Sequence, residues 1–273
     1  MSTPTRTPLD RKRLRSLLSE KSDFWNEVNV TEVTGSTNAD LAELARHGAG
    51  EGRVLIAEQQ TAGRGRLDRR WTCPSGAGLM MSVLLRPRRP AEEWGTLSLA
   101  AATALEETLR ATAGVSAKLK WPNDVLIGGR KVCGILAAAA GGEAPGAVVL
   151  GLGLNVSLTA EELPVPEATS LLLAGAATLD RETIAADFLA HFASVYRSWN
   201  ASGPARAIER WREYSDTLGR HVAVSFPNGR KAAGVATDIA ADGRLVVTGR
   251  DGEGREEVLT VAAGDVVHLR RGD

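Results

Sequence analysis

The chain has 273 residues, and its 33 lysine and arginine residues balance 33 aspartate and glutamate residues, so the formal net charge is zero. This balance argues against a general polyanion binder, which is usually basic overall. The only cysteines, Cys73 and Cys133, form no C-x-x-C pair, so neither a disulfide framework nor a cysteine zinc site is expected. Apolar stretches are far shorter than the roughly 20 residues that span a bilayer, and no signal peptide is evident. We therefore expect a cytoplasmic protein without a membrane partner.

The first 50 residues predict an extension and two helices. Residues 1–8 are rich in Ser, Thr and Pro, which is typical of disorder, and a short basic helix is predicted over 9–20. Thr37 and Asp40 have the spacing of a capping box at the start of a further helix, with Gly48 as its stop.

The middle of the chain alternates apolar runs with turn residues, which predicts buried strands and several helices. Strands are expected at residues 54–57, 78–87, 118–121, 131–139 and 147–156. One helix is expected at 94–109, a second begins at Asp180, and a third contains Trp211.

From residue 219 the character changes to short valine-rich runs separated by PNG, ADG and RDGEG, which predict a small antiparallel barrel. The expected division is an extension at 1–22, disordered or helical, a larger domain at 23–216 and a β domain at 217–273.

Residues 57–71 read AEQQTAGRGRLDRRW and place four arginines within seven positions. The third glycine of a dinucleotide fingerprint is replaced by Asp68, and no G-K-[ST] follows, so Rossmann and P-loop sites are not supported. A solvated basic loop is the plain alternative. Two glycines between paired arginines favour an anion site, because glycine admits close backbone approach and arginine binds carboxylate or phosphate with a planar fork.

A second motif is KWPND at 120–124, followed by GRKVCGIL at 129–136. P-N-D alone is usually a turn, and a lysine at a strand edge is usually snorkelling. If 118–126 and 131–136 form a hairpin, however, Lys131 and Asp124 line one cleft.

The remaining polar signals are weaker. GLGLNV at 151–156 predicts a buried strand whose glycines permit close approach, with Asn155 as a polar group in need of partners. The four histidines are scattered and predict no metal site, and both cysteines are expected to be buried structural thiols.

Together these segments resemble a biotin–protein ligase. The likeness lies in STN at 36–38, EQQTAGRGR at 58–66, KWPND, GRKVCGIL, GLGLNV, ATSL at 168–171 and LDRETIAADFL at 179–189. It implies an α/β (α+β) fold: a mixed sheet flanked by helices, like the catalytic domain of class II synthetases, followed by an SH3-like barrel.

The resemblance implies an ATP-dependent ligase that forms biotinyl-5′-AMP and transfers biotin to a lysine of a biotin carboxyl carrier protein. ATP, biotin and Mg²⁺ are the small molecules implied, and the carrier domain of a biotin-dependent carboxylase, such as acetyl-CoA carboxylase, is the partner. No DNA partner is expected, because the sequence before residue 30 leaves no room for a winged helix-turn-helix.

The resemblance also assigns residues. It implies catalytic roles for Arg66, Lys131 and Asp124. It implies biotin binding by Ser36, Thr37, Asn38, Gln60, Arg64, Gly65, Arg66 and Lys131. It implies binding of ATP or the adenylate by Arg64, Arg66, Trp71, Asn123, Asp124, Lys131 and Asn155, with Asp124 as a ligand of Mg²⁺.

The sequence departs from the family pattern at two places. Asp68 stands where the family usually has glycine, which should reduce the mobility and positive charge of the loop, or pair with Arg69 or Arg70. Ala137 and Ala138 stand where an acidic residue is usual.

Two alternatives stay open. A lipoate or octanoate ligase would share the scaffold and the adenylate chemistry. A nucleic-acid-binding module would use the basic loop, but zero net charge and few aromatic residues argue against it.

Overall fold

The structure, a computed structural model, describes residues 5–66, 69–140, 146–225, 231–250 and 255–262 and the main chain of 265–268. Its larger part is a seven-stranded sheet in the order β1-β2-β3-β7-β6-β5-β4. Only β1 and β2 pair in parallel, and every other neighbouring pair is antiparallel. The strands are β1 (Glu27–Thr34), β2 (Arg53–Gln60), β3 (Gly78–Leu85), β4 (Lys118–Lys120), β5 (Asp124–Ile127), β6 (Arg130–Ala140) and β7 (Ala147–Asn155).

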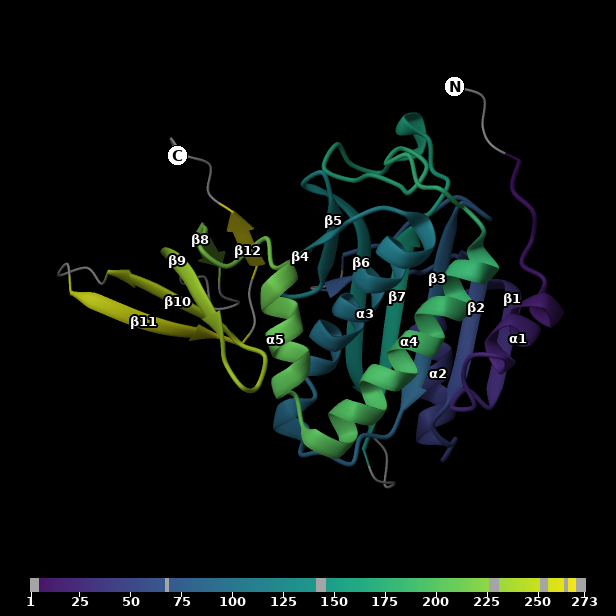
Figure 1. Cartoon of the computed structure of the whole chain (residues 1–273), viewed down its shortest axis with the longest axis horizontal. Helices are drawn as coiled ribbons and strands as arrows, with labels where there is room; N and C mark the ends of the chain where they lie inside the picture. The colour runs from purple at the N-terminus through teal and green to yellow at the C-terminus, as the bar shows by residue number, and fades with distance from the viewer. Residues whose placement is uncertain are drawn as a thin grey trace.

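Helices cover both faces of this sheet (Figure 1). One core joins α1 (Arg11–Ser19), α3 (Thr96–Ala113), α4 (Arg181–Ser202) and α5 (Ala205–Tyr214) to the sheet, and a smaller core lies under α2 (Thr37–Arg46). All eight residues of β3 are buried, because this central strand has helices on both sides. Two short 3₁₀ helices, η2 (Ala91–Glu93) and η3 (Ala160–Glu162), lie in connections.

The C-terminal part is a five-stranded antiparallel sheet in the order β11-β10-β9-β8-β12. Its strands are β8 (His221–Ser225), β9 (Lys231–Ile239), β10 (Leu245–Arg250), β11 (Glu256–Val261) and β12 (Asp265–His268). The predicted fold class, a helix-flanked mixed sheet followed by a small β structure, is confirmed, whereas the division at 22 and 216 stays a prediction. Among the described residues, no helix has the length and apolarity needed to cross a bilayer.

Local signals placed several element ends correctly. Asp180 is the N-cap of α4, where its side chain accepts a hydrogen bond from the Thr183 amide. Gly48 follows α2 with a φ of +82°, a conformation that glycine adopts without strain.

Two expectations need correction. The predicted capping box is wrong: the N-cap is Ser36, and the Asp40 carboxylate accepts a hydrogen bond from Thr34 Oγ1 at 2.5 Å. Residues 5–8 also differ from the disorder expected for this stretch, because Arg6 and Thr7 bond to residues more than 150 positions away. Residues 1–4 lie outside the described residues.

Candidate active site

A cavity of about 390 Å³ lies where the N-terminus of α2 meets the sheet. It is on the α2 side, because Val149 packs under α2 and Gly151 and Gly153 follow on the same face of β7. The predicted site residues all line it, namely Ser36, Thr37, Asn38, Gln60, Arg64, Gly65, Arg66, Trp71, Asn123, Asp124, Lys131 and Asn155. The fold therefore brings together segments that lie far apart in the sequence.

One wall of the cavity is a row of polar side chains. Gln60 Oε1 accepts the Thr37 backbone amide at 2.8 Å, so Gln60 satisfies one of the free N–H groups at the start of α2. The Thr37 hydroxyl lies 2.6 Å from the Ser82 hydroxyl, and Ser82 donates to Asn38 Oδ1 at 2.5 Å. Asn38 Nδ2 in turn donates to the Leu136 carbonyl at 3.2 Å. The row is thus fixed before any ligand arrives.

Ser82 is a supporting residue that sequence reasoning missed. It is fully buried in the middle of β3, where its neighbours are apolar. A lone hydroxyl in a buried apolar strand needs a hydrogen-bond partner, and that requirement is the signal that could have drawn attention to it.

The glycines of β7 make room for this site. A Cβ on Gly151 would lie 2.0 Å from Asn38 Oδ1, and one on Gly153 would lie 2.5 Å from Trp71 Cε2. The close approach predicted for the GLGLN segment is therefore present. Any larger residue would displace Asn38 or Trp71.

Lys131 and Asp124 form an ion pair across neighbouring strands, with 2.5 Å between Nζ and Oδ1. The predicted hairpin of β5 and β6 accounts for this contact. The main chain of Lys131 is fixed by residues 167 and 169, since its amide donates to the Glu167 carbonyl and its carbonyl accepts the Thr169 amide. Lys131 Nζ also lies 5.8 Å from the centroid of the Trp71 ring.

Asn123 and Asn155 hold their positions through backbone carbonyls. Asn123 Nδ2 donates to Ile135 O at 2.8 Å, and the buried Asn155 donates to Thr169 O at 2.9 Å. In both cases the amide nitrogen donates to a main-chain carbonyl, which fixes the side chain at the edge of the cavity.

The arginine loop, which is the connection between β2 and β3 (residues 61–77), folds back on itself. The Trp71 amide donates to Gly63 O at 3.0 Å, and the Gly65 amide donates to Arg69 O at 2.6 Å. Arg64, Arg66, Arg69 and Arg70 all line the cavity. Four arginines thus line one concave surface, which favours anionic ligands. Asp68, which is predicted to reduce the mobility and positive charge of this loop or to pair with Arg69 or Arg70, lies outside the described residues.

Other candidate chemistry is not supported. Burial raises the pKa of Cys73 to about 12 and also raises that of Cys133, so neither thiol ionises near neutral pH. Within the described ranges, no group of three or more His, Cys, Asp and Glu residues could hold a metal ion. Ala137 and Ala138, where an acidic residue was expected, are not among the cavity-lining residues.

Comparison with known proteins identifies the family. The sequence pattern of the biotin/lipoate A/B protein ligase family matches residues 30–155, and that of the biotin protein ligase C terminal domain matches 217–269. The chain is 44% identical to the biotin–[acetyl-CoA-carboxylase] ligase of Mycobacterium tuberculosis over 97% of both chains. The chain belongs to the biotin protein ligase family. The predicted enzyme class, a ligase, is confirmed with it.

Other members of the biotin protein ligase family are more distant. The bifunctional ligase/repressor BirA of Bacillus subtilis is 34% identical over 81% of this chain and 69% of its own length. The solved biotin protein ligase from Aquifex aeolicus, in complex with biotin and ATP, has the same fold. It matches 90% of this chain and 99% of its own with a TM-score of 0.74, at 24% identity.

Proposed function

We propose that this chain activates biotin with ATP and attaches it to a protein lysine. First, a biotin carboxylate oxygen attacks the α-phosphorus of ATP, the bond to the bridging oxygen breaks, and pyrophosphate leaves. Then the amine of the acceptor lysine attacks the acyl carbon of biotinyl-5′-AMP, AMP leaves, and the amine loses its proton. The acceptor would be the biotin carboxyl carrier domain of a carboxylase, an assignment supported by the name of the M. tuberculosis relative.

The observation that carries the proposal is the convergence of cationic side chains on one cavity. Arg64, Arg66, Arg69, Arg70 and Lys131 all line it. The first step brings together two anions that repel each other in water, so it needs fixed positive charge more than it needs an acid–base pair. Arg66 and Lys131 are therefore the proposed catalytic residues, placed to neutralise the carboxylate and the α-phosphate.

The polar wall suits the biotin end of the reaction. A ureido ring offers two N–H donors and one carbonyl acceptor, and the wall formed by Ser36, Thr37, Asn38 and Gln60 offers both kinds of group. Arg64, Gly65 and Arg66 border it, so the carboxylate of a bound biotin would face the arginine loop.

A second group of cavity residues suits the nucleotide. Asn123, Asp124 and Asn155 line the cavity, and Trp71 offers an aromatic face next to Lys131. Mg²⁺ usually binds through one or two carboxylates together with substrate phosphates, which fits the single carboxylate of Asp124. Mg²⁺ would help neutralise the phosphates, while Asp124 holds Lys131 in place until the anions arrive.

The test is a biotinylation assay. The chain is incubated with biotin, ATP, Mg²⁺ and a purified carrier domain, and the intact mass of the carrier is measured. We expect the mass to rise by one biotinyl group, with no rise when ATP is omitted. Pyrophosphate exchange with biotin, lipoate or octanoate identifies the acid that is activated, and exchange with lipoate alone would refute the biotin assignment.

A cytoplasmic location stays a prediction, consistent with two free cysteines.

A further inference from the structure

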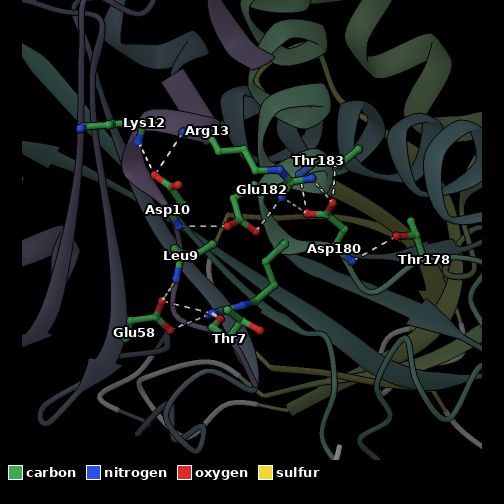
Figure 2. A network of polar contacts seen from close by, with 11 residues as sticks. Thr7, Leu9, Asp10, Lys12, Arg13, Glu58, Thr178, Asp180, Glu182 and Thr183 are labelled. Carbon is green, nitrogen blue, oxygen red and sulfur yellow. Dashed lines mark hydrogen bonds and ion pairs between the residues drawn. The ribbon is translucent and has the colours of Figure 1, made fainter. Parts of the chain in front are cut away.

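A buried ion pair lies under the N-terminal segment of the chain. Arg181 donates two hydrogen bonds to the Glu58 carboxylate, at 2.7 and 3.1 Å, and both side chains are less than a tenth exposed. The main chain of the N-terminal segment completes this pair (Figure 2). Arg181 donates to Thr7 O at 2.7 Å, and Glu58 accepts the Leu9 amide at 2.5 Å. The segment therefore bonds both members of the pair, which a buried pair needs to offset its desolvation.

Arg6, in the same segment, connects two other parts of the chain. Its guanidinium donates to the Glu162 carboxylate at 3.0 and 2.5 Å and to the Ser157 carbonyl at 3.1 Å. Its side chain also packs on Gly76, where an added Cβ would lie 3.1 Å from Arg6 Cβ. Arg6 thus joins the chain just after β7 to the chain just before β3.

Both of these connections flank the candidate active site. Glu58 is two residues before Gln60 in β2, and its carbonyl accepts the Gly76 amide at 3.3 Å. Gly76 ends the segment that returns from Trp71, and Ser157 is two residues after Asn155. The N-terminal segment therefore contacts the base of the arginine loop on one side and the continuation of β7 on the other.

The segment is itself fixed independently of the cavity. The Asp10 amide donates to Glu182 at 3.0 Å, and Arg13 pairs with Asp180 (Figure 2). Leu14 and Leu18 of α1 are buried. It can therefore serve as a rigid support for the two flanks.

We propose that Arg6 and the Glu58–Arg181 pair are positioning residues of the ligase, through which residues 6–13 hold the base of the arginine loop against the segment after β7. The inference rests on the function proposed above. None of these residues lines the cavity, so they act on the reaction through Gln60, the arginine loop and Asn155.

The test compares Arg6→Ala with the full wild-type chain. We expect the turnover number of adenylate formation to fall about tenfold, while the dissociation constant of biotin changes less than about threefold, because the polar wall stays in place. Hydrogen exchange of peptides within residues 69–78 should become faster, with α3 unchanged. A role in global stability alone would leave the turnover of the folded enzyme and the exchange of this segment at wild-type values.

Two further variants complete the experiment. Arg15→Ala replaces an exposed arginine of α1 that lies outside residues 6–13, and it should keep wild-type turnover and exchange at residues 69–78. Glu162→Gln keeps the shape of the Arg6 partner. It should change the turnover number and the hydrogen exchange of residues 69–78 in the same direction as Arg6→Ala, but by less. Wild-type exchange and turnover in both Arg6→Ala and Glu162→Gln would overturn the proposal. Hydrogen exchange needs no turnover, so it tests the support even if the wild-type chain fails to activate biotin.

Discussion

Lys131 projects from β6 between the Asp124 carboxylate and the ring of Trp71. Its main chain is bonded to residues 167 and 169, so its side chain starts from a fixed point. In the proposed mechanism it neutralises charge at the carboxylate and the α-phosphate, and these charges meet only in the first step.

Lys131→Ala should therefore lower the rate of adenylate formation by roughly 100-fold or more, while transfer from preformed biotinyl-5′-AMP falls much less. Pyrophosphate exchange and a single-turnover transfer assay separate the two steps. Lys118→Ala, an exposed lysine on β4, is the matched control and should behave as wild type. Normal synthesis with defective transfer would contradict the role given to Lys131.

Gly151 is the second position where one residue decides the site. Gly151→Ala would push Asn38 away from Ser82, since the new Cβ and Asn38 Oδ1 would be only 2.0 Å apart. We expect biotin to bind at least about tenfold more weakly by calorimetry, because overpacking displaces the polar wall. Gly50→Ala, which meets open space, should bind biotin normally. An unchanged affinity in Gly151→Ala would remove Asn38 from the biotin site.

At the level of elements, α4 begins with a residue that has two tasks. Asp180 caps the helix through the Thr183 amide and pairs with Arg13. The hydrogen bond from Arg13 holds the pKa of Asp180 well below its ordinary value of 3.8. The folded protein thus keeps this carboxylate ionised at a pH where the unfolded chain takes up a proton, so its stabilisation is present above pH 4 and is lost as the pH falls further.

Two substitutions separate these tasks. Asp180→Asn keeps a capping group but removes the charge, whereas Asp180→Ala removes both and should cost about 1 kcal/mol more at neutral pH. In urea unfolding, the difference between wild type and Asp180→Asn should shrink between about pH 5 and pH 3. A difference that stays constant over this range would mean that the ion pair does not stabilise the fold.

At the level of the whole molecule, the C-terminal sheet is anchored beside the candidate active site. The Trp121 amide donates to the buried Thr217 hydroxyl at 2.9 Å, and Trp121 Nε1 donates to Gly243 O at 3.0 Å in the β9–β10 turn. Trp121 directly precedes Pro122 and Asn123, so the C-terminal sheet supports the part of the cavity that these residues line.

Thr217→Val should lower the free energy of unfolding by about 1–3 kcal/mol, because the Trp121 amide would be left buried without this acceptor. Thr237→Val, at an exposed position on β9, serves as the control and should stay within about 0.5 kcal/mol of wild type. Urea unfolding measured by tryptophan fluorescence gives both values. Equal stabilities for the two variants would show that this anchor contributes nothing.

The amino-acid sequence by itself determined the local features of the chain and the residue types that line the cavity. Turn residues, the Asp180 cap, the Gly48 stop and the arginine loop depend on neighbours within a few positions, so their types and spacing were readable. The pairing of Lys131 with Asp124 was also predictable, because a short hairpin joins them.

Only the tertiary structure decided which distant groups meet. Ser82 joins Thr37 and Asn38 through the register of β3, and Glu58 meets Arg181 across 123 positions. The same holds for the N-terminal segment, whose composition is typical of disorder but whose backbone completes a buried ion pair. Such contacts are stabilised by burial and by hydrogen bonds made after the chain has folded, and no local pattern in the sequence encodes them.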